Sequence, residues 1–116
     1  MSFGKIRIRK ADTIFRQYLL KTRGERCEYC GKQGRIEVSH YHGRRKEATR
    51  FCEKNCALLC NFHHRNFHEN PASYVEWMKK RLGEKEYNKL TISANSYCKR
   101  DDKLQEIYWR NKLNNL

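Results

Sequence analysis

Residues 27–68 read CEYCGKQGRIEVSHYHGRRKEATRFCEKNCALLCNFHHRNFH, and this stretch carries the side chains that decide the fold. Cys27 and Cys30 are separated by two residues, and Cys60 and His63 repeat that spacing. Each pair can bind a metal ion from one tight turn, and two such pairs complete the tetrahedral set of sulfur and nitrogen ligands that zinc prefers. The sequence therefore predicts one structural zinc site formed by these four residues.

The cysteines also leave alternatives open. A Cys-x2-Cys pair can be a redox centre, although no strand–helix–strand pattern surrounds this one. Cys52 and Cys56 can displace Cys60 from the zinc site, but we prefer Cys60, because together with His63 it repeats the spacing of the first pair. Cys98 is expected to be a packed free thiol. With no secretory signal in the sequence, this cysteine usage indicates a reducing compartment.

The composition limits both the fold and the partner. A chain of 116 residues with 38% hydrophobic and 34% charged residues can form one domain with a modest core. Bound zinc stabilises such small modules by on the order of 10 kcal/mol. The 26 lysines and arginines exceed the 13 acidic residues and give a net charge of +13, which favours nucleic acid as the partner. A membrane is not expected, because the sequence has no long apolar run and no lipidation motif.

Apolar periodicity predicts helices around the central stretch. The first should run over about 10–22, where Ile14, Phe15 and Leu19 recur at helical spacing, and should end at Gly24. Another should begin at Cys60 or Asn61 and carry His64 and His68 one turn apart. The part over 70–116 should be helical, with helices from Asn70-Pro71 to Gly83, from Glu84 to about Ser93, and from Asp101 to about Leu113.

Strand signals lie inside the central stretch. Residues 35–40 alternate polar and apolar side chains, which predicts a half-buried strand with His40 at its end. Period two places Glu37 and Ser39 on the face opposite to His40. A second short strand is predicted near Thr49 to Phe51, and residues 1–9 suit either a short edge strand or a flexible arm. These expectations together give one α+β domain over residues 1–116.

The residues of this stretch suit the hydrolysis of a phosphodiester, which needs a base, a cation and groups that hold the phosphate. His40 is a candidate base, because an imidazole is largely unprotonated near neutral pH. His64 and His68, four residues apart on one helix, can bind one ion together. The basic residues that follow His40 can bind phosphate oxygens; these candidates are Arg44, Arg45, Lys46 and Arg50.

The order of these residues resembles a known family. His40, then Asn55, then His64 nine residues later, framed by Cys-x2-Cys and Cys-x2-His, is similar to the zinc-ribbon HNH endonucleases. The phrases SHYHGRRKEATRF and NCALLCNFHHRNFHE resemble phage and prophage members in particular. The resemblance implies a ββα-metal core over 27–69, stapled by the two zinc-ligand pairs and flanked by helices. It also implies the cytoplasm of a bacterial or phage-infected cell.

The resemblance assigns roles to these residues. His40 matches the general base, and Asn55 matches the asparagine that orients the loop and in some members reaches the metal. His64 matches a ligand of the catalytic ion, and His68 resembles an extra helix ligand. Many relatives carry Asp directly before the base, where this chain has Ser39. The ion would then depend on His64 and His68, with help from Ser39 or His42, and His42 stays open as an alternative base.

The expected function is that of a metal-dependent DNA endonuclease, a hydrolase with structural Zn2+ and catalytic Mg2+ or Mn2+. By resemblance, the helix that carries His64 and His68 approaches the minor groove, and cleavage leaves 5'-phosphate and 3'-hydroxyl ends. The protein is expected to be a monomer or a weak dimer. With one active centre, a monomer should nick one strand of DNA, and cleavage of both strands would need a dimer or two events. The alternative is a non-catalytic zinc-ribbon DNA-binding module, and an RNA-directed nuclease is a third option.

Overall fold

A computed structural model of the protein describes residues 6–116. Its elements, in chain order, are α1 (Lys10–Arg23), β1 (Ile36–His40), α2 (Glu47–Arg50), the 3-10 helix η1 (Glu53–Asn55), β2 (Cys56–Cys60), α3 (Asn61–Glu69), α4 (Pro71–Leu82), α5 (Glu84–Ala94) and α6 (Asp102–Asn114). The α+β class expected from the sequence is therefore confirmed. Residues 6–9 form neither helix nor strand, and the rest of the suggested N-terminal strand or arm lies outside the described residues.

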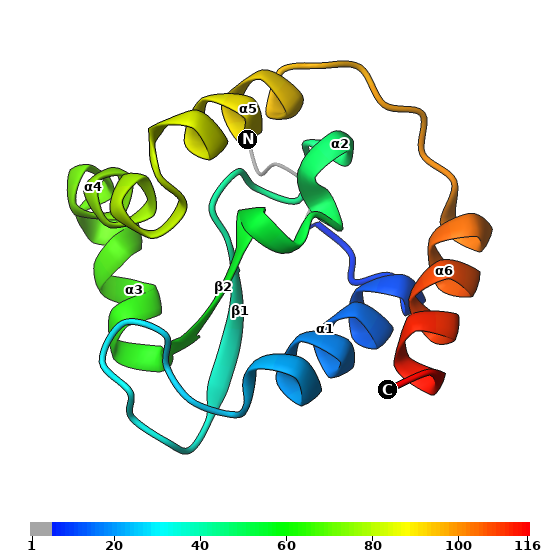
Figure 1. The fold of residues 1–116 in the computed structure, drawn as a ribbon, viewed down its shortest axis with the longest axis horizontal. Helices are drawn as coiled ribbons and strands as arrows, with labels where there is room; N and C mark the ends of the chain where they lie inside the picture. Colours follow the sequence, from blue (N-terminus) through cyan, green and yellow to red (C-terminus); the bar gives the residue numbers. More distant parts are fainter. Residues whose placement is uncertain (1–5) are drawn as a thin grey trace.

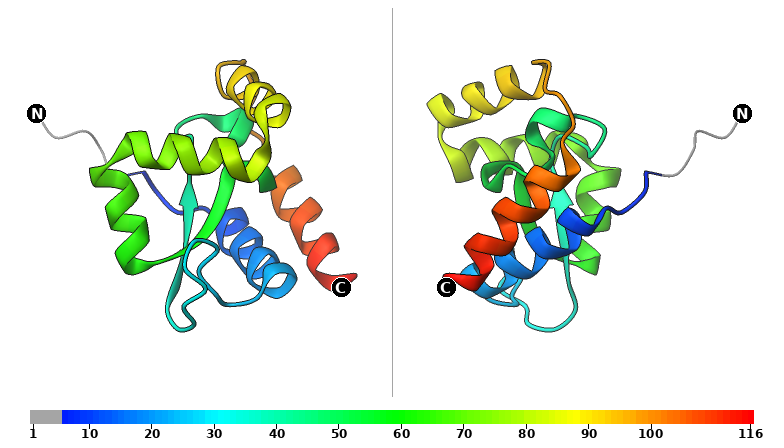
Figure 2. Two further views of the ribbon diagram at one scale, coloured as in Figure 1. Left: turned by 60° about the vertical axis from the view of Figure 1, so that its left-hand side comes forward. Right: turned by 90° about the vertical axis from the view of Figure 1, so that its right-hand side faces the viewer.

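The described residues form a sheet of two antiparallel strands at the centre of the fold, with Ile36 opposite Cys60 and His40 opposite Cys56. Figures 1 and 2 show α1 and α6 on one side of this sheet and α3 and α4 on the other. Helix α3 follows β2 directly and packs against both strands. The helix that carries His64 and His68 is thereby fixed beside the strand that carries His40.

The second strand was predicted at the wrong place. Residues 49–51 lie in and just after α2, whereas the strand is β2, with the sequence CALLC. Every residue of β2 is buried, so the strand has no polar face and lacks the alternation that marks a half-buried strand. Helices on both sides of the sheet explain why β2 reads as an uninterrupted apolar run.

The helices begin and end close to the predicted positions for local reasons. Helix α1 begins where the Asp12 carboxylate accepts a hydrogen bond from the Arg9 backbone N–H at 2.7 Å, and it ends at Gly24. Gly24 has a φ of 86°, a backbone conformation that residues other than glycine adopt only with strain. Pro71 at the first turn of α4 has the fixed φ that suits a helix start.

Two groups of aromatic side chains form much of the core. On one side of the sheet, Phe15 of α1 lies 4.5 Å from Trp109 of α6 between ring centroids. On the other side, Phe67 of α3 stacks on Tyr74 of α4 at 4.5 Å. Burying a large apolar side chain contributes about 1.5–3 kcal/mol, so these pairs join α6 and α4 to the central elements. No helix within residues 6–116 has both the length and the apolar character needed to cross a bilayer.

The turn between the two N-terminal cysteines covers the outer edge of β2. The Glu28 backbone N–H donates to the Leu58 carbonyl at 2.7 Å, and the Leu58 N–H donates to the Glu28 carboxylate at 2.6 Å. Arg23 and Arg81 both pair with this carboxylate and both donate to the Cys56 carbonyl. Because an open strand edge leaves backbone groups unpaired, these contacts attach the cysteine turn firmly to the sheet.

Candidate functional site

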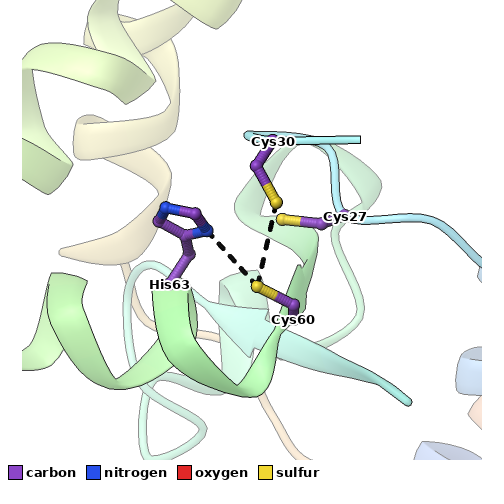
Figure 3. Close-up of side chains that lie close together, drawn as sticks. All are labelled: Cys27, Cys30, Cys60 and His63. Atoms are coloured by element: carbon purple, nitrogen blue, oxygen red, sulfur yellow. Dashed lines mark hydrogen bonds between the residues drawn. The ribbon is translucent and has the colours of Figure 1, made fainter. Parts of the chain in front are cut away.

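Four side chains from three elements converge at one end of the sheet (Figure 3). Cys27 and Cys30 come from the turn after α1, Cys60 ends β2, and His63 lies in the first turn of α3. Their ligand atoms all lie within 4.8 Å of one another. Three sulfurs and one imidazole nitrogen at this spacing are a donor set that fits a structural metal ion such as zinc.

The backbone around the cysteine turn favours the thiolate form of Cys27. Burial raises the pKa of this thiol, but hydrogen bonds from the backbone amides of Cys60, Cys30 and Tyr29 outweigh burial and hold the pKa below its usual value. Gly31 closes the turn with a φ of 78°, and its N–H donates to the Cys27 carbonyl at 2.8 Å. Since metal ions bind the thiolate, the turn prepares the Cys27 thiol to bind a cation.

The alternative ligands lie elsewhere. Cys56 begins β2, four residues before Cys60, which at about 3.3 Å per residue places it about 13 Å along the strand. Burial raises the pKa of the Cys56 thiol, which keeps it protonated. Cys98 is exposed and not packed, contrary to expectation. The residues brought together are therefore the four that the repeated spacing selected.

A second group of residues lines a cleft of about 760 Å³ along β1. We call it the histidine cleft, because His40 at the end of β1 and His64 and His68 of α3 all line it. The cleft is bordered by α1, β1, α3 and the loop after β1, and its charged lining residues are Asp12, Arg16, Arg35, Glu37 and Arg44. Three histidines from two elements thus line one cleft together with three arginines.

His40 is held by the backbone of α2. Its Nε2 lies 3.0 Å from the Arg50 carbonyl oxygen, and because a carbonyl only accepts, Nε2 carries the proton and Nδ1 keeps its lone pair. Burial lowers the pKa of His40 to about 4, against the opposing effect of this hydrogen bond. The ring is therefore neutral throughout the neutral pH range and keeps the lone pair on Nδ1 free to accept a hydrogen bond.

His64 and His68 lie next to each other on α3, with 5.5 Å between their ring centroids. The Nδ1 atom of His64 lies 2.7 Å from a carboxylate oxygen of Glu37. Sequence reasoning missed Glu37, because it placed this residue on the strand face opposite to His40 and no spacing links it to His64. The observed pairing with α3 adds a carboxylate to the donors of the histidine cleft.

Asn55 is fully buried and ties together the segment between the strands. Its side-chain amide donates to the carbonyls of His42 and Thr49 at 2.9 and 3.0 Å, and its side-chain oxygen accepts from the His42 N–H at 2.8 Å. Its own carbonyl accepts from the Tyr41 N–H at 2.9 Å. Asn55 does not line the histidine cleft, so its contacts are those of a residue that holds the loop beside His40.

Ser39 and His42 are not placed for the suggested role in ion binding. The Ser39 hydroxyl is buried and lies 2.7 Å from the Tyr74 hydroxyl. The His42 ring packs edge-on against Tyr41 with 4.8 Å between centroids, and its buried Nε2 finds no hydrogen-bond partner among residues 6–116. Neither side chain lines the histidine cleft. Of the two candidate bases, His40 and His42, only His40 lines it.

The basic residues divide into two groups. Arg44 lines the histidine cleft, and Arg45 and Lys46 are exposed on the same loop. Arg50 was wrongly predicted to contact nucleic acid, because its side chain is 2% exposed and forms an ion pair with Asp12 at 2.5 Å. Its guanidinium also donates to two backbone carbonyls, so it is structural. Arg16 and Arg35, which sequence reasoning missed, line the cleft instead.

Comparisons of the chain with family models, with curated proteins and with solved structures find no match.

Proposed function

We propose that this protein is a metal-dependent DNA endonuclease of the HNH type. The observation that carries the proposal is the meeting of His40, His64 and His68 in one cleft, although α2, η1 and β2 separate β1 from α3 along the chain. Two antiparallel strands followed directly by a helix agree with a ββα-metal core. A DNA-binding module without catalysis would explain the metal cluster and the charge, but not this convergence of histidines.

The two groups of donors suit two different ions. The cluster of three cysteines and His63 would hold zinc and fix the cysteine turn to β2 and α3. His64 and His68, with a carboxylate beside them, would hold a divalent ion such as Mg2+ or Mn2+ in the cleft. When bound, that ion stabilises the negative charge that develops on the leaving oxygen.

The protein's own groups supply the remaining parts of the reaction. His40 takes a proton from the attacking water at Nδ1, because its Nε2–H is engaged by the Arg50 carbonyl. Arg16, Arg35 and Arg44 bind the phosphate oxygens and place the scissile phosphate between His40 and α3. Asn55 keeps the loop from His42 to Thr49 in position, which maintains the geometry around the base.

Duplex DNA is the proposed substrate, and the net charge of +13 supports binding to its phosphates. By resemblance to HNH enzymes, α3 enters the minor groove and the products carry 5'-phosphate and 3'-hydroxyl ends. One histidine cleft cleaves one strand per binding event, so a monomer nicks DNA, and a double-strand break requires a weak dimer or two events.

Supercoiled plasmid provides the test. With Mg2+ or Mn2+ the wild-type protein should convert it to the open-circle form, and His40→Ala should lower the rate at least 100-fold, within the range for loss of a general base. His42→Ala, which alters a histidine outside the cleft, is the matched control and should stay active. Duplex binding with no cleavage under either ion would instead identify a DNA-binding module, and cleavage of RNA alone would overturn the choice of substrate.

A further inference from the structure

We infer that Glu37 is a positioning residue of the catalytic ion site, which holds His64 in the tautomer whose Nε2 binds the ion. This inference rests on the proposed function and extends it to a residue of β1 that the His-Asn-His pattern does not contain. Its basis is the 2.7 Å contact between the Glu37 carboxylate and Nδ1 of His64 inside the histidine cleft.

The chemistry of the two groups fixes the direction of the hydrogen bond. An ionised carboxylate only accepts, so Nδ1 of His64 carries the proton and donates it to Glu37. The neutral ring then keeps its lone pair on Nε2, which becomes the one atom through which His64 can bind a cation. Metal-binding histidines commonly donate their second ring nitrogen to a carboxylate, which orients the ring and raises its basicity as a ligand.

The surroundings argue against an incidental surface ion pair. The Glu37 side chain is 33% exposed and that of His64 is 25% exposed, so solvent screens the contact only in part. Arg16 and Arg35 line the same cleft, yet the carboxylate lies against His64. Of the acidic residues that line the cleft, Asp12 is already paired with Arg50, which leaves Glu37 to serve the histidines.

Glu37 and His64 both lie on elements whose positions are fixed by other contacts. Glu37 is the second residue of β1, where it is the register partner of Leu59 in β2. His64 follows directly after His63, and both Cys60 and His63 belong to the metal cluster at the start of α3. The cluster joins α3, which carries His64, to β2, and β2 pairs along its length with β1, which carries Glu37, so the contact is preorganised before the catalytic ion binds.

Two substitutions separate a positioning role from direct ligation. Glu37→Gln keeps an oxygen that can accept the Nδ1 hydrogen but removes the charge, whereas Glu37→Ala removes the acceptor. If Glu37 is a positioning residue, Glu37→Gln should weaken ion binding less than Glu37→Ala does. If Glu37 is a direct carboxylate ligand, both changes should weaken ion binding strongly. Glu76→Gln on α4, an exposed residue paired with Lys80, is the control for the loss of one negative charge.

The experiment uses the zinc-loaded full chain and two readouts that do not depend on cleavage. Long-range 1H–15N spectra, recorded without added divalent ion, report which nitrogen of His64 is protonated. Titration with Mn2+ gives the dissociation constant of the ion. We expect the Nδ1–H tautomer in the wild type and in Glu37→Gln, a mixture of tautomers in Glu37→Ala, and Mn2+ binding about 10- to 100-fold weaker in Glu37→Ala than in the wild type.

The outcomes distinguish this inference from the proposed function. If Glu37→Ala keeps the wild-type tautomer and binds Mn2+ as the wild type does, the role of Glu37 is overturned while the nuclease proposal stands. If both Glu37 variants lose Mn2+ equally, Glu37 is a ligand and not a positioning residue. If the wild type binds no Mn2+ and cleaves no DNA, the proposed function fails and this inference fails with it.

Discussion

The Arg50 carbonyl oxygen accepts a hydrogen bond from Nε2 of His40 at 3.0 Å, while the side chain of the same Arg50 is buried against Asp12. A residue that looked like a phosphate contact in the sequence therefore anchors the candidate base. Because Asp12 belongs to α1 and Arg50 to α2, their ion pair fixes the segment whose carbonyl orients His40. Stability and the geometry of the base should consequently change together.

Asp12→Ala should destabilise the protein strongly. The change leaves the Arg50 guanidinium buried without its partner, and breaking a buried ion pair on one side costs about 3–5 kcal/mol. Urea unfolding of the zinc-loaded protein measures the loss, and plasmid nicking should fall as His40 loses its fixed partner. The control is Glu86→Ala, which breaks the exposed Lys54–Glu86 pair and should leave the unfolding midpoint nearly unchanged. Equal effects of the two variants would contradict the structural role of Arg50.

The lowered pKa of His40 predicts a loss of stability in mild acid. The unfolded chain binds a proton on this histidine near pH 6.5, while the folded protein does so only near pH 4. Between these values the unfolded state binds more protons. The contribution of neutral His40 to the free energy of unfolding is therefore complete above pH 6.5. It is lost as the pH falls towards 4, by up to about 3 kcal/mol.

Unfolding free energies at pH 7.5, 6 and 5 test this expectation for the wild type and for His40→Gln. Acid also protonates the cysteine and histidine ligands of the metal cluster, but that effect is common to both proteins. The difference between the two slopes of unfolding free energy against pH therefore gives the contribution of His40 alone. Parallel slopes would show that its ring is not buried as the structure places it.

Metal removal should unfold the chain, since binding of a structural zinc contributes on the order of 10 kcal/mol to small modules. Native mass spectrometry should find one zinc ion in the protein as prepared, and a chelator should abolish the helical circular-dichroism signal. Cys60→Ser should lose the ion, whereas Cys56→Ser and Cys98→Ser should retain it. Retention in Cys60→Ser with loss in Cys56→Ser would move the site to the other cysteines.

The parts that could be predicted from the sequence are those in which a local pattern determines the structure. Helix α1, with apolar residues at helical spacing and Gly24 at its end, and the repeated Cys-x2-Cys and Cys-x2-His spacing are of this kind. Strand β2 was misplaced because burial on both faces removes the alternation that would reveal it. The roles of Arg50 and Glu37 depend on partners far away in the chain, Asp12 and His64, and no local pattern encodes those partners.

The arginines of the histidine cleft offer a prediction about DNA binding that does not depend on catalysis. Arg35 lines the cleft and is exposed. Arg35→Ala should therefore weaken duplex binding about equally for unrelated DNA sequences. It should also reduce the slope of log affinity against log salt concentration by about 1, as expected when one phosphate contact is lost. Arg110→Ala is the matched control, because Arg110 is an exposed arginine on α6, which lies beyond α1 from the sheet (Figure 1). Fluorescence anisotropy with a labelled duplex, in zinc-loaded protein without added Mg2+ or Mn2+, measures both slopes. Both variants lower the net charge by one. An equal loss of affinity in both would mean that DNA binding depends only on the net charge of the protein, and the phosphate would then have no fixed place beside His40.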